Sequence, residues 1–254
     1  MPGFDALVRL FAALDGLLER CEPAPWGAIV TDARLPRIYD ANYARVDGTT
    51  DVSLAEVEGL LLPELERSGA RFAHVVALDP EATPRLVADM RGRGRQMTLD
   101  TVMRAEPTRA VIDADHAVDE AHPGEGLWTD LRASLPEFDI KDEETIDQVV
   151  RWQRDVLAPN GKRWFAVRMD GSTAGIGSLF VRGDVGYIDD VVTRGRARRR
   201  GVGGSIVRHM LRLAAEQGTQ EVYLLADQPG PIRLYERLGF SAVGEVVGAL
   251  RPLP

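Results

Sequence analysis

The sequence predicts a mixed α/β protein, in which helices pack on a mixed β-sheet. Two observations support this fold class. Residues 186–218 have the pattern of a strand, a turn rich in arginine and glycine, and a helix. The order strand, helix, strand, helix, strand also occurs twice, once within residues 1–106 and again from residue 186. Such alternation is typical of helices that cover a sheet.

Composition excludes several classes of function. The formal net charge of −8 argues against general nucleic-acid binding. No apolar run reaches the ~20 residues of a membrane helix. From the charge we expect no nucleic acid as partner, and from the short apolar runs we expect no membrane. The N-terminal residues lack the pattern of a signal peptide, which favours a cytoplasmic location. Cys21 is the one cysteine, and four scattered histidines predict no metal site. Only two of the 31 lysines and arginines are lysines, which suggests a GC-rich bacterial genome.

Residues 1–106 are predicted to form an α/β domain of their own. An apolar stripe predicts a helix over residues 4–20, which either packs on this domain or forms a contact in a homodimer. Ser53 and Glu56 have the spacing of a capping box, so a helix should begin there. The other predicted elements are strands at 27–31, 39–46, 72–78 and 95–104, and a short helix at 81–92.

Residues 107–254 are predicted to form the second domain. We expect a first strand from Arg109 to Ile112, two helices, and then a hairpin with its turn at Asp170 and Gly171. A strand from Gly186 and a helix from Gly203 follow. The remaining expected elements are helices at 126–135 and 143–157, hairpin strands at 164–169 and 174–181, a strand at 221–227, a helix at 231–238 and two final strands.

The turn after residue 193 has the chemistry of an anion site. Backbone N–H groups at a helix start have no partner within the helix, and the helix dipole makes that end partly positive. Glycines let a ligand approach the backbone, and arginines bind phosphate oxygens. The turn contains Arg198, Arg199, Arg200, Gly201, Val202, Gly203, Gly204 and Ser205. It therefore predicts a diphosphate site.

Two common diphosphate motifs are excluded. A P-loop would end in Gly-Lys-Ser or Gly-Lys-Thr, which does not occur here. A dinucleotide fingerprint would need a third glycine where Ile206 stands, so an NAD- or FAD-dependent oxidoreductase is disfavoured. Residues 198–203 (RRRGVG) instead resemble the Q/R-x-x-G-x-G/A turn of the GNAT superfamily of N-acetyltransferases. Residues 227–240 (DQPGPIRLYERLGF) resemble a second segment of that family, D-N-x-x-A-x-x-L-Y-E-K/R-x-G-F.

The resemblance implies a GNAT fold for residues 107–254, with acetyl-CoA as acyl donor and no metal. It implies that the pantetheine arm lies between the 186–193 and 221–227 strands and bonds the backbone of Val191, Val192 and Thr193. Asp227 and Gln228 would lie near this arm, although the family usually has Asn in place of Gln228. Tyr235 matches the tyrosine that protonates the coenzyme A thiolate. The alternative is a tyrosine that only packs its ring.

A base is needed because only a neutral amine attacks the thioester. Asp189 and Asp190 precede the arginine turn, and their spacing resembles the E-D-x-V-V strand of glucosamine-phosphate acetyltransferases. Adjacent strand residues face opposite sides, so we expect only one of the two to face the acceptor. The alternative is that both acids pair with the nearby arginines.

The repeated order of elements predicts that residues 1–106 are a degenerate half-copy of the GNAT fold; the alternative is an unrelated α/β domain. The turn that matches the arginine turn, residues 47–52, has two acids, one glycine and no arginine. It would repel a diphosphate, so we do not expect this half to bind coenzyme A.

The function predicted is direct transfer of an acetyl group to a primary amine of a small molecule or peptide, by a monomer or homodimer. No cysteine in the motif region could carry the acyl group. The alternative is a catalytically silent module that binds coenzyme A as a sensor or scaffold.

Overall fold

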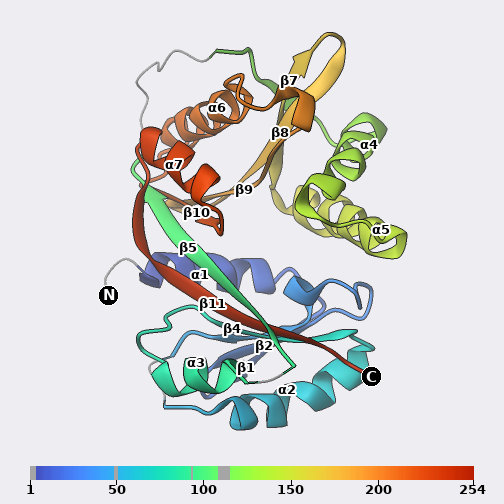
Figure 1. The fold of residues 1–254 in the computed structure, drawn as a ribbon, viewed down its shortest axis with the longest axis vertical. Coiled ribbons are helices and arrows are strands. Elements are labelled where there is room, and N and C mark those ends of the chain that lie inside the picture. The colour runs from blue at the N-terminus through green and yellow to red at the C-terminus, as the bar shows by residue number, and fades with distance from the viewer. Residues whose placement is uncertain (1–3, 49–50, 93, 108–114) are drawn as a thin grey trace. The chain divides into compact units, whose positions relative to one another are not determined.

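A computed structural model describes residues 4–48, 51–92, 94–107 and 115–254. The chain forms two compact units (Figure 1). Unit 1 comprises residues 1–102 and 243–254, and unit 2 comprises residues 103–242. Residues 243–254, which we expected in the C-terminal domain, therefore belong to the N-terminal unit.

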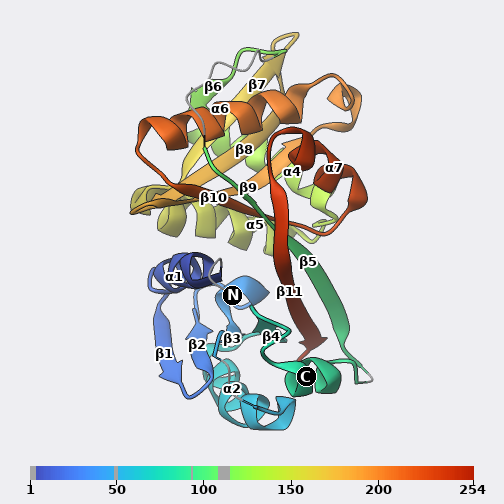
Figure 2. The ribbon, with the colours of Figure 1, turned by 90° about the vertical axis from the view of Figure 1, so that its left-hand side faces the viewer.

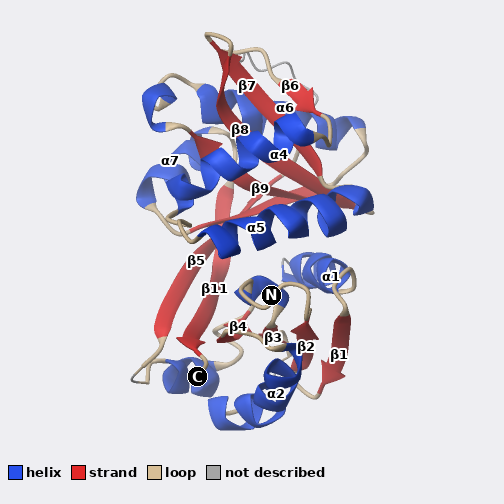
Figure 3. Cartoon of the chain, turned by 90° about the vertical axis from the view of Figure 1, so that its right-hand side faces the viewer, coloured by secondary structure: helices blue, strands red, loops and turns tan. Residues whose placement is uncertain are grey.

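Unit 1 has helices on both faces of its sheet. The first three strands are antiparallel, β4 is parallel to β3, and β11 is antiparallel to β4 (Figure 2). Helix α1 (Phe4–Asp15) lies on one face, and α2 (Leu54–Ser68) and α3 (Pro84–Met90) lie on the other (Figures 1 and 3). The strand order is β1 (Arg20–Ala24), β2 (Gly27–Thr31), β3 (Tyr43–Val46), β4 (Phe72–Ala77), β11 (Ser241–Pro252) and β5 (Gln96–Ala105).

Helix α2 begins at the predicted capping box. The Ser53 hydroxyl accepts from the Glu56 N–H at 3.3 Å, and the Glu56 carboxylate accepts from the Ser53 N–H at 2.8 Å. The strand expected at 39–46 begins instead with a 3₁₀ turn at Tyr39–Ala41. Strand β1 was not predicted, because its polar, mostly exposed residues and Pro23 give no strand pattern, as is common at a sheet edge.

Unit 2 has an antiparallel sheet extended by a parallel strand. Strands β6 to β9 are antiparallel neighbours, and β10 is parallel to β9. Helix α6 (Val202–Glu216) packs on one face, and α4 (Glu125–Ser134) and α5 (Glu143–Trp152) pack on the other (Figure 1). The strand order is β5, β10 (Glu221–Ala226), β9 (Val185–Thr193), β8 (Ser172–Arg182), β7 (Arg163–Met169) and β6 (Asp119–Ala121).

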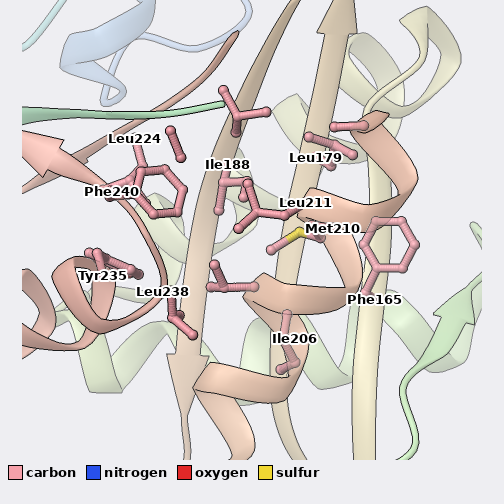
Figure 4. Close-up of a cluster of buried hydrophobic side chains, with 14 of the residues drawn as sticks. Phe165, Leu179, Ile188, Ile206, Met210, Leu211, Leu224, Tyr235, Leu238 and Phe240 are labelled. Atoms are coloured by element: carbon pink, nitrogen blue, oxygen red, sulfur yellow. The ribbon is translucent and has the colours of Figure 1, made fainter. Parts of the chain in front are cut away.

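The core of unit 2 follows from strand alternation. Phe165 points to the α6 face, where it joins a cluster that includes Ile188, Met210 and Tyr235 (Figure 4). Its neighbour Trp164 points to the α4 and α5 face. Each fully buried large side chain contributes about 1.5–3 kcal/mol, so the two clusters fix both helix layers on the sheet. Tyr235 lies on α7 (Pro229–Arg237), so the α6 cluster also anchors this helix.

Some elements differ from expectation. The strand predicted at 109–112 lies outside the described residues. The short strand β6 was not predicted, and α5 continues as a π-helical turn at Gln153–Leu157. One long strand, β11, follows α7 in place of the two expected strands.

The two units share one order of elements. Unit 1 has β1-β2-β3-α2-β4-α3, and unit 2 has β7-β8-β9-α6-β10-α7. In both, three antiparallel strands are followed by a helix and a parallel strand. The strand after α3, β5, lies beside β10, while the strand after α7, β11, pairs with β4. In its order of elements, unit 1 thus resembles a half-copy of unit 2.

Candidate active site

Strands β9 and β10 separate partway along their length. They pair in parallel from Val185 and Glu221 to Tyr187 and Tyr223. Strand β9 then continues to Thr193, but its residues beyond Tyr187 do not pair with β10. Backbone groups on the β10 side of this stretch can therefore bond a ligand. Val191, Val192 and Thr193, the residues expected to bond the pantetheine arm, all lie on it.

A bulge in β9 directs two adjacent acids to the same face. Strand β8 pairs Ile176 with Val192 and Ser178 with Asp189, so β9 has one extra residue between these pairs. Asp190 has a φ of 53°, in the left-handed region that non-glycine residues rarely adopt. The premise that the two acids would face opposite sides was wrong, because regular alternation fails at a bulge.

Lys162 lies between the two acids. Its Nζ is 3.0 Å from an Asp189 oxygen and 2.7 Å from an Asp190 oxygen. The Ser178 hydroxyl donates to the same Asp190 oxygen at 2.9 Å. The side chain of Lys162 is 3% exposed and that of Asp190 is 18% exposed, whereas that of Asp189 is 42% exposed. The acids therefore pair with a buried lysine, not with the arginines of the turn.

The electrostatics of this cluster are set by burial and by close charges. Burial disfavours the charged form of Lys162, but the two carboxylates outweigh it and the pKa of Lys162 is raised. Burial and the charge of Asp189 raise the pKa of Asp190, against the opposing effect of Lys162 and Ser178. Burial and the same Asp189 charge raise the pKa of Tyr235 to about 12, so this phenol keeps its proton at neutral pH.

The turn after β9 has the backbone of an anion site. Gly201 is the N-cap of α6 and has a φ of 82°. The Ser205 N–H donates to the Gly201 carbonyl at 2.9 Å, as the first bond of the helix. The N–H groups of Val202, Gly203 and Gly204 therefore precede the helical bonding pattern and point out of the helix start.

Three elements meet at this helix start. A side chain on Gly203 would come within 3.3 Å of the Thr193 hydroxyl on β9 and 3.6 Å of Leu234 on α7. Tyr235 is the next residue of α7. Asp227 and Gln228 are exposed and connect β10 to α7, where Gln228 is the N-cap and its side chain makes no capping hydrogen bond. The residues predicted for the site thus come from neighbouring elements at one end of unit 2.

The arginines of the turn have different surroundings. Arg198 pairs with Glu137 and also donates to the Thr193 carbonyl at 3.2 Å. Arg199, with a φ of 61°, and Arg200 are both exposed. The carboxylate of Asp115 lies against Gly201, at the position that a Cβ atom would occupy.

Sequence reasoning missed Lys162, Ser178 and Glu137. The one available signal was that Lys162 is one of only two lysines and directly precedes a strongly apolar strand. Within the described residues, no group of His, Cys, Asp and Glu could hold a metal ion. In the same part of the chain, no helix is long and apolar enough to cross a membrane.

The matching strands of unit 1 stay together. Strands β3 and β4 pair from Tyr43 and His74 to Val46 and Ala77, and the Leu78 N–H donates to the Val46 carbonyl at 2.9 Å. In the described part of unit 1, β3 therefore pairs with β4 over its whole length, whereas β9 does not pair with β10 beyond Tyr187.

Comparisons with known proteins agree with the fold. Residues 125–240 match the model of the Acetyltransferase (GNAT) family. A GCN5-related N-acetyltransferase from Kribbella flavida has a similar structure, with a TM-score of 0.66, 18% identity, and coverage of 97% of this chain and 96% of that one. No curated protein sequence shows significant similarity to this chain.

Two further solved structures are similar over most of the chain. A functionally unknown conserved protein from Staphylococcus epidermidis gives a TM-score of 0.69 at 13% identity, with 88% of this chain and 90% of that one covered. A tandem GNAT protein from the clavulanic acid biosynthesis pathway gives 0.57 at 15% identity, with 83% and 75% covered. The second of these parallels the repeat of elements between units 1 and 2.

Proposed function

Residues 125–240 form a domain of the GNAT acetyltransferase family, and from this premise we propose that the protein transfers an acetyl group from acetyl-CoA to a primary amine. The observation that carries the proposal is the separation of β9 from β10 beside the start of α6. It leaves unpaired backbone groups of β9 next to a helix start with outward N–H groups, which suits a thioester on a pantetheine arm that ends in a diphosphate.

Acetyl-CoA fits the residues present. The N–H groups of Val202, Gly203 and Gly204 would receive the diphosphate, with the exposed Arg199 and Arg200 adding positive charge. Arg198 would need to leave Glu137 to reach a phosphate. The backbone of residues 191–193, with Asp227 and Gln228, would contact the pantetheine arm.

The residues of the cluster supply the proton transfers. The carboxylate of Asp189 or Asp190 takes a proton from the acceptor ammonium, and the neutral nitrogen attacks the thioester carbon. The new N–C bond forms as the C–S bond breaks, and the Tyr235 hydroxyl gives its proton to the leaving sulfur. The nitrogen then loses its second proton, which returns to the Tyr235 phenolate through solvent, so the products are the amide and the thiol of coenzyme A. Transfer is direct, because Cys21, the one cysteine, lies in unit 1.

The acceptor in this proposal is an amine of a small molecule or a peptide, used in the bacterial cytoplasm by a monomer or homodimer. The experiment mixes the purified protein with acetyl-CoA and a panel of primary amines and follows release of free thiol. Calorimetry measures acetyl-CoA binding separately. Failure to bind acetyl-CoA would overturn the proposal.

A second candidate is a silent coenzyme A-binding sensor or scaffold. It is favoured by one observation: both candidate bases already pair with a lysine of the protein itself. Tight acetyl-CoA binding without turnover of any amine in the panel would establish this second function.

A further inference from the structure

We propose that Lys162 is a positioning residue for the reaction: its ammonium group holds Asp189 and Asp190 together on one face of β9 and leaves Asp189 as the carboxylate that accepts the proton of the acceptor amine. The inference rests on the proposed function, since it assigns roles within the same site.

The geometry separates the roles of the two acids. Asp190 is 18% exposed, and one of its carboxylate oxygens accepts from both Lys162 and the Ser178 hydroxyl, so this oxygen is engaged inside the protein. Asp189 is 42% exposed and has Lys162 as its ion-pair partner. An acceptor amine that approaches from solvent therefore meets Asp189 first.

The charges of the cluster favour the same assignment. One ammonium and two carboxylates sum to one negative charge, so one carboxylate balances Lys162 and the other remains to attract a cationic amine. Two adjacent carboxylates without a cation between them would repel each other. The ammonium of Lys162, within 3.0 Å of both, offsets this repulsion.

Lys162 is itself fixed from several sides. It directly precedes β7, after a turn in which its own N–H donates to the Leu157 carbonyl at 3.0 Å. Its ammonium lies 5.5 Å from the centre of the Trp164 ring, a cation–π contact on the same face of the sheet. These contacts give the ammonium a defined place from which to orient both acids.

The titratable groups that face the cluster come from three segments of the described chain. They are Asp189 and Asp190 on β9, Lys162 directly before β7, and Tyr235 on α7, whose pKa responds to burial and to Asp189. A pH profile of activity therefore reports on these groups together.

The first test is the pH dependence of kcat/KM in Lys162→Met. Loss of the cation should move the acid limb of the profile to higher pH by about 1–3 units, the range of shift caused by a close opposite charge. On the acid limb itself, where activity follows the ionised fraction of the base, kcat/KM should fall roughly tenfold for each unit of that shift, and it should recover to the plateau at higher pH. Lys141→Met is the matched control, because Lys141 is the other lysine and pairs with Asp139 at an exposed site.

The outcome of the kinetic test separates the two hypotheses. A variant that loses activity equally at every pH, with its acid limb unmoved, would show that Lys162 only supports the fold and would overturn the inference. A parent protein that acetylates no amine would instead refute the proposed function.

The second test needs neither activity nor the Lys162 variant. Protein with ¹⁵N-labelled lysine side chains gives two Nζ signals, which Lys141→Met assigns. The Lys162 signal should shift as the carboxylates take up protons below neutral pH, and both Asp189→Asn and Asp190→Asn should change that shift. A Lys162 signal insensitive to both variants would overturn the inference, as would acetylation of Lys162 on incubation with acetyl-CoA, detected by mass spectrometry.

Discussion

Gly201→Ala tests the anion-binding turn directly. Gly201 has a φ of 82°, and an alanine in the left-handed region costs about 1–2 kcal/mol. Its Cβ would also overlap the carboxylate of Asp115. The turn must therefore shift, and the N–H groups of Val202 and Gly203 move away from the phosphate position.

The magnitude follows from the hydrogen bonds at stake. A hydrogen bond to a charged group contributes about 1.5–3 kcal/mol, and about 1.4 kcal/mol changes a dissociation constant tenfold. Loss of one such bond in Gly201→Ala should therefore weaken acetyl-CoA binding by about ten- to a hundredfold.

Gly218→Ala is the matched control at the other end of α6. Gly218 has a φ of 81°, and a Cβ there would meet nothing within 4 Å. Both variants carry the same backbone strain, so both should lose about 2–8 °C in Tm. Only Gly201→Ala should lose affinity for acetyl-CoA, measured by titration calorimetry. If both variants bind acetyl-CoA as tightly as the parent, the diphosphate is not held at this turn.

Three further predictions concern single side chains. Tyr235→Phe should lower kcat about 10²–10⁴-fold with little change in acetyl-CoA affinity; unchanged kcat would remove the acid role. Asp189→Asn should lower kcat/KM at least tenfold. Asp190→Asn should in addition lower the free energy of unfolding by about 3–5 kcal/mol in denaturant titrations, because it breaks a buried ion pair. Equal stability of the two variants would contradict this difference. In unit 1, burial raises the pKa of Asp15 to about 6, so the folded state gains stability from this group as pH falls from 6 towards 3.8. Burial lowers the pKa of His74 to about 4, so the folded state loses stability as pH falls from 6.5 towards 4. Asp15→Asn removes the opposing gain, so the Tm of this variant should fall more steeply with acid in this window. If the Tm of Asp15→Asn depended on pH as the Tm of the parent does, the opposing contributions of Asp15 and His74 would be refuted.

Local signals in the sequence predicted most of the elements. The capping box at Ser53 located the start of α2, because both of its hydrogen bonds lie within four residues. Gly201 and the glycines after it located the start of α6, since the left-handed N-cap needs a glycine. Such features depend on neighbours in the chain and not on the rest of the fold.

The roles of the two acids could not be read in the same way. Asp190 adopts a left-handed conformation because β9 has one more residue than the facing part of β8, and this count depends on how two strands align. The lysine between the acids comes from the turn before another strand, 27 residues earlier than Asp189. The sequence therefore predicted an acid pair but not its shared face or its buried partner.

A comparison of the two repeats shows where the pairing of β9 differs from that of its counterpart β3. Strand β3 pairs with β2 and β4 in an unbroken register and has no bulge, and it remains beside β4 to Val46. Its counterpart β9 carries the extra residue at Asp190 and leaves β10 after Tyr187. A bulge bends its strand and increases the local twist, so it can turn β9 away from a parallel neighbour. The extra residue that lets Asp190 reach Lys162 thus lies in the stretch of β9 that does not pair with β10, where we place the thioester, and the described pairing of β3 has neither feature.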